Sequence, residues 1–164
     1  MATANSSGLH CPLTKMNFLV SVDQVSGVAA FSEVTGIDAT VDVIEFRQGN
    51  SSSLAPVKMQ GLVKHGNITL KMGCTRDQDF KTWVQNCVSG HRGETPRRDV
   101  TIELIDIGAG TPRSTVETPT GGGPVWLLKG AWVTKYTGPD LNATTSEVVM
   151  ETVELAYEEI TLPS

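Results

Sequence analysis

Residues capable of metal or acid–base chemistry are few and widely spaced in this sequence of 164 residues. The histidines are His10, His65 and His91. Only His10 has a second ligand type beside it, Cys11, and one adjacent pair in a polar leading segment falls short of a metal site's three or four ligands. Glu158-Glu159 is the only adjacent acidic pair, and neighbours on a strand point to opposite faces, so the two cannot act together on one substrate.

Two further patterns could suggest chemistry, and neither meets its requirements. Gly121-Gly122-Gly123 is a glycine run of the kind that cradles phosphate, but no Lys-Ser or Lys-Thr follows it and no helix is predicted to begin there. The three cysteines lack paired spacing, and Cys74 and Cys87 lie in apolar-patterned segments, which indicates reduced, inert, partly buried thiols. We therefore predict no catalytic residue, no metal and no cofactor, and we do not expect an enzyme.

The composition fits a single globular domain. Hydrophobic residues make up 39% and charged residues 19%, and the formal net charge is −5. Clustered cations are absent apart from Arg97-Arg98, so specific nucleic-acid binding is not expected. No segment approaches the ~20 apolar residues that span a bilayer. Residues 1–13 lack the charged start and apolar core of a signal peptide, so we expect synthesis in the cytoplasm without membrane anchoring.

Alternating apolar residues predict seven strands. The first two, residues 17–23 and 28–34, are expected to pair as a hairpin around the turn at Ser26-Gly27. The other five are predicted over residues 40–46, 67–72, 100–104, 125–136 and 147–160.

Side-chain parity within these strands predicts which residues face inward. Ile68, Leu70 and Met72 share one face, as do Val100, Ile102 and Leu104, with Glu103 outward; a third set is Trp126, Leu128 and Trp132. The apolar parity of residues 147–160 changes along the segment, which predicts a β-bulge near Glu151-Thr152.

One segment, residues 76–89, has helical periodicity. Its apolar stripe consists of Phe80, Trp83, Val84, Cys87 and Val88. Thr75 and Gln78 fit a capping box, and Gly90 supplies the stop. Together these elements predict a β-sandwich or open barrel with one helix covering a side. We expect a flexible arm over residues 1–15 and one domain over residues 16–164.

Residues 47–56 form a polar, small-residue connection that is longer than the usual hairpin loop. Two interpretations stay open from spacing alone: a mobile surface loop, or a projecting hairpin that becomes ordered only against a neighbouring molecule.

Several motifs, taken in order, make residues 17–160 resemble the tail tube proteins of contractile bacteriophage tails and the inner-tube proteins of extracellular contractile injection systems. Phe31-Ser32-Glu33-Val34-Thr35-Gly36-Ile37 is similar to the family's F-x-E-V-[ST]-G-[IL] signature. Lys58-Met59-Gln60-Gly61 leads into residues 68–73 as in its K-x-x-G…I-T-L-K-x-G block. The signature positions are Phe31, Glu33, Val34, Gly36, Lys58, Gly61, Ile68, Leu70, Gly73 and Trp83. Residues 98–104, the Trp126…Trp132 strand and residues 141–148 complete the match.

The resemblance implies a mainly β fold, with two packed antiparallel sheets and one helix, and a structural function. Family members form hexameric rings whose sheets join around a lumen, and the rings stack into a tube that a contractile sheath drives through an envelope. The implied partners are further copies of the chain, a sheath protein, a baseplate hub or spike, a terminal cap, and any cargo carried in the lumen. The implied inter-ring contact loop consists of Arg47, Gln48, Gly49, Asn50, Ser51, Ser52, Ser53 and Leu54.

Three alternatives stay open beside the repeating tube subunit of a phage tail or injection system. The arm before residue 17 and the segment 108–124 are longer than the family pattern, which would suit a specialised first-ring paralogue at the baseplate. A secreted ring protein of the type VI kind has a similar fold. A β-sandwich binding module would use its loops, but residues 47–56 and 108–124 lack Trp, Tyr and Phe.

Overall fold

The computed structural model describes residues 17–25, 31–50, 52–74, 78–90, 96–105, 123–144 and 147–163. Several predictions lie outside these residues: the arm over residues 1–15, most of segment 108–124, the turn at Ser26-Gly27, and Thr75 of the capping box. The same holds for His10, Cys11, His91 and two residues of the glycine run. The arm and the domain boundary stay predictions.

The described residues form nine strands and one helix, two strands more than predicted. They are β1 (Phe18–Val22), β2 (Phe31–Thr35), β3 (Thr40–Phe46), β4 (Val57–Lys64), β5 (Ile68–Gly73), α1 (Gln78–Val88), β6 (Arg98–Leu104), β7 (Val125–Thr137), β8 (Met150–Ala156) and β9 (Glu159–Thr161). Periodicity missed β4, and the single strand expected over residues 147–160 is two strands, β8 and β9.

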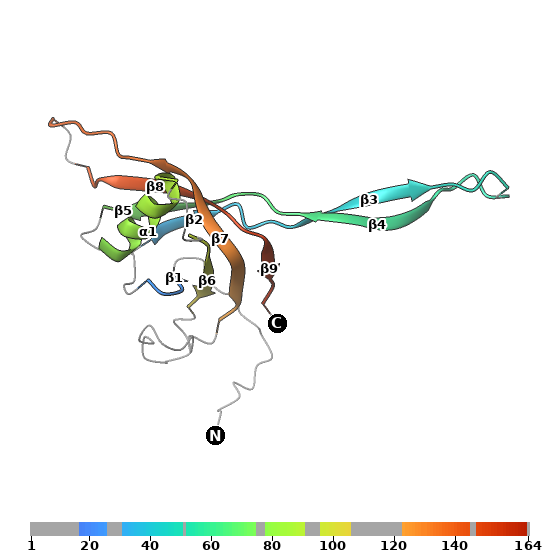
Figure 1. Cartoon of the computed structure of the whole chain (residues 1–164), viewed down its shortest axis with the longest axis horizontal. Helices are drawn as coiled ribbons and strands as arrows, with labels where there is room; N and C mark the ends of the chain where they lie inside the picture. Colours follow the sequence, from blue (N-terminus) through green and yellow to red (C-terminus); the bar gives the residue numbers. More distant parts are fainter. Residues whose placement is uncertain are drawn as a thin grey trace, which may run out of the picture.

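Strand β7 belongs to both sheets of the body and joins them. Its first half pairs with β6 and β9, and its second half pairs with β8, always antiparallel. One sheet is therefore β1-β6-β7 with β9 beyond β7, and the other is β7-β8-β5-β2. Figure 1 shows β7 crossing the body in orange, with α1 lying beside the sheets. The predicted fold class, two antiparallel sheets with one helix, is confirmed.

A β-bulge at Lys129-Gly130 changes which face of β7 points inward. Leu128 pairs with Val100 but Ala131 pairs with Arg98, so β7 holds one extra residue at this point. Gly130 has φ +62°, a conformation that glycine adopts without strain. The expectation that Trp126, Leu128 and Trp132 share one buried face was therefore wrong. Beyond the bulge Ala131 and Val133 are buried, while Trp132 is only half-buried.

The predicted pairing of the first two strands as a hairpin was also wrong. β1 pairs with β6, where Val20 lies opposite Ile102, and β2 pairs with β5, where Val34 lies opposite Leu70. Alternation specifies that a strand has one buried face but does not name its partner, because any antiparallel strand with the same period fits. The two consecutive strands therefore lie in different sheets.

Strand β8 has no bulge at Glu151-Thr152, contrary to prediction. Its pairing with β5 is uninterrupted from Met150 to Leu155, and Glu151 is buried on the same face as Val153. The apparent change of parity arose because a carboxylate occupies an inward position. Lys81 of α1 lies 3.7 Å from Glu151 and partly compensates its charge. Glu103, predicted to point outward, is buried as well.

The core lies between the sheets and under α1. Its most deeply buried side chains are Ile68, Leu70, Met72, Val100, Leu128, Val153 and Leu155. Phe80, Trp83 and Val84 are buried, Cys87 is partly buried against the core and Val88 is exposed, so the predicted stripe ends at Cys87. Gly90, with φ +64°, follows the end of α1 as expected.

Trp83 is the anchor of α1. Its ring packs edge-on against Phe80 at 5.6 Å, and its Nε1–H donates to the carbonyl oxygen of Pro96 at 2.6 Å. Trp83→Ala is expected to lower the free energy of unfolding by about 3–5 kcal/mol, because it leaves a cavity and removes the indole hydrogen bond to Pro96. Denaturant unfolding of the variant and the unmodified protein measures this difference in the free energy of unfolding. Gln85→Ala on the exposed face should change stability by less than about 0.5 kcal/mol, and equal losses for both variants would contradict the assignment.

Candidate assembly surfaces

The β3–β4 hairpin projects far from the body and touches none of the sheets along most of its length (Figure 1). β3 and β4 pair only with each other and form a separate two-stranded sheet. Every residue of β3 is exposed, and so is every residue of β4 except Gly61, which is intermediate. An isolated two-stranded ribbon is marginally stable in water at best. Of the two interpretations that the sequence left open, a projecting hairpin describes the observed shape, and its ordering against a neighbouring molecule stays a proposal.

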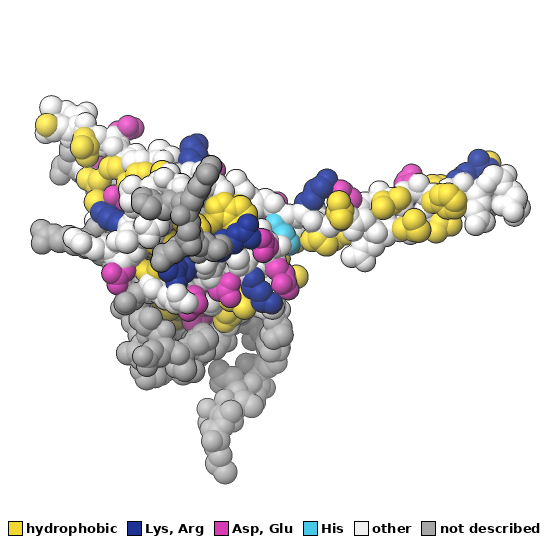
Figure 2. Space-filling view, viewed as in Figure 1, with side chains coloured by type: hydrophobic (Ala, Val, Ile, Leu, Met, Phe, Trp, Pro, Cys, Tyr) yellow, Lys and Arg dark blue, Asp and Glu magenta, His cyan; other side chains and the backbone are white. Residues whose placement is uncertain are grey.

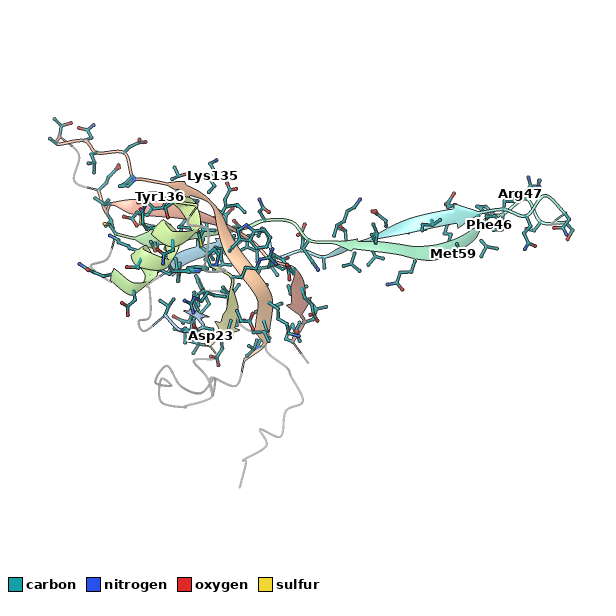
Figure 3. The ribbon with its side chains drawn as sticks, viewed as in Figure 1. Asp23, Phe46, Arg47, Met59, Lys135 and Tyr136 are labelled. Atoms are coloured by element: carbon teal, nitrogen blue, oxygen red, sulfur yellow. The ribbon has the colours of Figure 1, made fainter. Side chains whose placement is uncertain are left out.

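The outer half of the hairpin has one apolar face. Ile44 pairs with Met59 and Phe46 pairs with Val57, and directly opposed residues share a face. Closer to the body, Val43 is 61% exposed and Leu62 is 75% exposed. Hydrophobic side chains extend along the projection in Figure 2, and Figure 3 shows Phe46 and Met59 near its outer end. Contiguous exposed apolar surface of this kind marks a protein–protein contact.

Charged groups on the hairpin are paired across the strands but add little stability. Lys58 lies 3.6 Å from Glu45, and Lys64 lies 2.7 Å from Asp42, all well exposed to solvent. Such pairs fix the register of the two strands and leave the apolar positions as the available source of binding energy. The hairpin is thus an exposed surface suited to contact with another molecule, and its own two strands contribute little to its stability.

The tip corresponds to the contact loop implied by the family resemblance. Its described residues are Arg47, Gln48, Gly49, Asn50, Ser52, Ser53 and Leu54, all exposed; Ser51 lies outside the described residues. Arg47 Nε donates to the carbonyl oxygen of Ser53 at 3.5 Å, and the Ser53 hydroxyl accepts from the Ala55 N–H at 3.2 Å. Leu54 is 85% exposed, an apolar side chain with nothing of its own subunit against it. Its role as an inter-ring contact is a proposal.

The root of the hairpin is anchored to the body by residues that the sequence analysis did not single out. The Tyr157 hydroxyl donates to the carbonyl oxygen of Asp38 at 2.7 Å, and the Gly66 N–H donates to Asp38 Oδ1 at 2.7 Å. The His65 ring lies 5.0 Å from that of Tyr157. Burial raises the pKa of Tyr157 above its usual value, so the phenol keeps its proton as a donor. The root therefore holds the direction of the ribbon.

The remaining signature residues hold β2 and β5 together beside that root. Lys71 and Glu33 form a cross-strand ion pair at 2.8 Å, and the Phe31 ring packs on Phe80 at 5.6 Å. Ile68 and Leu70 belong to the core, and Val34 packs against it. Gly61 opposes Asp42, whose carbonyl oxygen would lie 2.9 Å from an added Cβ. Gly73 has open space beside it, and nothing in the structure explains a glycine there.

A second projection, the distal arm, comprises residues 138–144 and 147–149, between β7 and β8. It leaves the body at the end opposite to the hairpin (Figure 1). Leu141 is 81% exposed and Val148 is 79% exposed. Asn142 Oδ1 accepts from the N–H and hydroxyl of Thr144 at 3.0 and 2.7 Å, which shapes the turn. Residues 141–148 match a family motif, but no pattern in them predicted an exposed projection.

The described residues offer little chemistry beyond these surfaces. They contain no group of three or more His, Cys, Asp or Glu side chains that could hold a metal ion. Burial raises the pKa of the Cys87 thiol, as expected for an inert cysteine, but Cys74 is exposed, contrary to the expectation of partial burial. Within the described part of the chain, no helix is both long and apolar enough to cross a membrane.

Comparison with models of known protein families identifies the family of this chain. The family model described as T4-like virus tail tube protein gp19 matches residues 14–161, nearly the whole sequence. The chain therefore belongs to this tail tube family. No curated protein sequence matches it significantly.

Solved structures agree in fold. A chain of the PVC sheath–tube complex of an extracellular contractile injection system is 24% identical, with 99% of each chain covered and a TM-score of 0.71. One from the PVC sheath/tube terminator is 25% identical over 95% of this chain and 99% of that one, with a TM-score of 0.72. A third, from the six-fold symmetrised baseplate of the anti-feeding prophage, is 21% identical over 94% and 97%, with a TM-score of 0.69.

Gly36 sets the path from β2 into the hairpin. Its φ is +89°, and an added Cβ would lie 2.4 Å from the carbonyl oxygen of Asn67. Gly36→Ala is expected to cost at least about 1–3 kcal/mol of stability, because strain and a backbone clash act together. Gly49→Ala at the tip, where no atom lies within 4 Å, should change stability by less than about 0.5 kcal/mol. Thermal unfolding compares the two, and a neutral Gly36→Ala would contradict this reading.

Proposed function

We propose that this chain is a structural subunit of the inner tube of a contractile tail or extracellular contractile injection system, forming hexameric rings that stack into a hollow tube. The observation that carries the proposal is the uncovered β3–β4 hairpin on a chain of the tail tube family. An apolar ribbon without cover in its own subunit is stabilised when another copy covers it.

Lateral assembly has a physical basis in the sheet edges. Within the described part of the subunit, the outer edges of β1, β2 and β9 have no partner strand. Open edges expose N–H and C=O groups that pair readily with another chain. A heterologous contact of this kind closes into a ring when its rotation divides a full turn. The six-fold symmetry named for the baseplate relative supports a ring of six.

Other partners follow from the assemblies in which the relatives occur. The related structures are described as a sheath–tube complex, a sheath/tube terminator and a baseplate. On this basis the partners are further copies of the chain, a sheath protein, a baseplate hub or spike and a terminal cap, with the lumen open to cargo. The particle is a phage tail or a tail-like injection device, and the chain serves in it without catalysis.

The alternatives differ in testable ways. A first-ring paralogue at the baseplate would form a single ring per particle, about six copies in a hexamer, whereas the repeating subunit is the most abundant tube component. A secreted type VI-like ring protein would be recovered free in the medium and not inside a sheathed particle. A β-sandwich binding module would bind glycans or peptides as a monomer. Quantitative mass spectrometry of purified particles distinguishes these cases, and the tail tube family match favours a tube protein over a β-sandwich binding module.

Removal of residues 49–55 tests the stacking role of the tip. The deletion should leave the fold intact, because none of the described residues in this stretch is buried, and should abolish long tubes while sparing single rings. Negative-stain microscopy of purified protein measures tube length, and circular dichroism checks the fold. Leu54→Ser is the milder companion, expected to shorten tubes. Long tubes from the deletion variant would refute the stacking role, and dispersed monomers of the unmodified chain at high concentration would refute the tube.

A further inference from the structure

The hairpin and the distal arm lie at opposite ends of the long axis of the subunit (Figure 1). Both consist mostly of exposed residues, and both carry apolar side chains that are half or more exposed to solvent. On the hairpin these include Phe46 and Leu54, and on the arm Leu141 and Val148. Two uncovered apolar projections on one chain need an explanation in terms of a partner.

Repetition along one direction restricts which surfaces can meet. Subunits that repeat head-to-tail form a heterologous contact, in which a surface at one end of a subunit contacts a different surface at the opposite end of the next. The hairpin occupies one end, so its acceptor must be exposed at the other end. Among the described residues, the distal arm is the element that extends farthest in that direction (Figure 1).

The two projections are complementary in charge as well as apolar character. Arg47 stands at the outer end of the hairpin, as labelled in Figure 3. The Glu45–Lys58 pair close to it and the Asp42–Lys64 pair nearer the body are each neutral overall. The described residues of the arm include Asp140 and Glu147, both exposed, and no Lys or Arg. An approaching hairpin thus brings one cation to two anions, which favours this register over the reverse.

We propose that the distal arm of one subunit is the acceptor for the β3–β4 hairpin of a second copy of this chain in the adjacent ring. This inference rests on the proposed tube function and adds to it the identity of the receiving surface. The apolar face with Ile44, Phe46 and Met59 covers Leu141 and Val148, and Arg47 lies beside Asp140 and Glu147. The exposed apolar residues of both ends are then removed from water in one contact.

A charge exchange tests the pairing. Arg47→Glu should reduce the fraction of subunits in tubes at least about tenfold at low salt, because it places like charges together. Adding Asp140→Lys should restore most of that fraction. The matched control instead adds Gln85→Lys with Asn86→Lys, which gives the same net charge on the exposed face of α1, away from the arm, and should restore none of it. Equal rescue by both second changes, or by neither, would overturn the arm as acceptor.

Crosslinking gives an independent readout. Phe46→Cys with Leu141→Cys, in a Cys11→Ser, Cys74→Ser background, is treated with a short bismaleimide linker. A ladder of covalent oligomers well beyond the dimer is expected, because each subunit would be joined to one above and one below. Phe46→Cys with Gln85→Cys on the exposed face of α1 is the control, expected to give no ladder. Tubes without an arm-specific ladder would overturn the acceptor while leaving the tube intact; unmodified protein that forms no rings or tubes would overturn the proposed function itself.

Discussion

Two strands that have only each other as neighbours cannot bury their side chains, and this constraint governs the β3–β4 hairpin. One face of its outer half carries Ile44, Phe46, Val57 and Met59 in direct cross-strand pairs, with nothing over them. These apolar residues thus lie where they add little to the stability of the isolated subunit. Their stabilisation has to come from another molecule, since hydrophobic burial is proportional to the area removed from water. Self-assembly is the physical consequence of that arrangement.

The body is organised to hold this ribbon at a defined angle. β7 passes from one sheet to the other through the bulge at Gly130 and so ties both sheets into one core. β5, next to β8 in that core, begins directly after the hairpin returns. Tyr157, just past β8, holds the Asp38 carbonyl at the root. A ribbon with a loose root would lose more conformational entropy on docking, so the anchored root favours association.

Sequence periodicity predicted the local elements well and their partners poorly. Alternation in residues 67–72 and the stripe of Phe80, Trp83 and Val84 were confirmed, because each depends only on which residues meet the core. The β1–β2 hairpin was wrong, because strand pairing is decided by long-range register that a period of two cannot encode. The bulge was predicted at Glu151 but is found at Gly130. A buried carboxylate such as Glu151 gives the same sequence pattern as a change of the inward face, whereas a glycine within a strand allows the bulge itself.

The assembly surfaces were predictable to different degrees. The long polar connection over residues 47–56 fitted a projecting hairpin as well as a mobile loop, so the sequence alone did not decide between them. β4 escaped periodicity because it is exposed on both faces and has no inward side to mark it. Residues 141–148 matched the family pattern, and residues 147–149 were included in a predicted strand, but no pattern marked the distal arm as a projection. A surface that another chain covers does not alternate between buried and exposed positions within its own subunit. The periodicity of a single sequence therefore does not reveal such a surface.

Amide hydrogen exchange, measured on dispersed subunits and on assembled tubes, tests the central claim that the hairpin is completed only by another copy. In dispersed subunits the amides of β3 and β4 should exchange rapidly while those of β5 and β8 are protected. In tubes the exchange of β3 and β4 should slow by more than about a hundredfold. Equal protection of β3, β4, β5 and β8 in the dispersed subunit, with no change on assembly, would contradict the account.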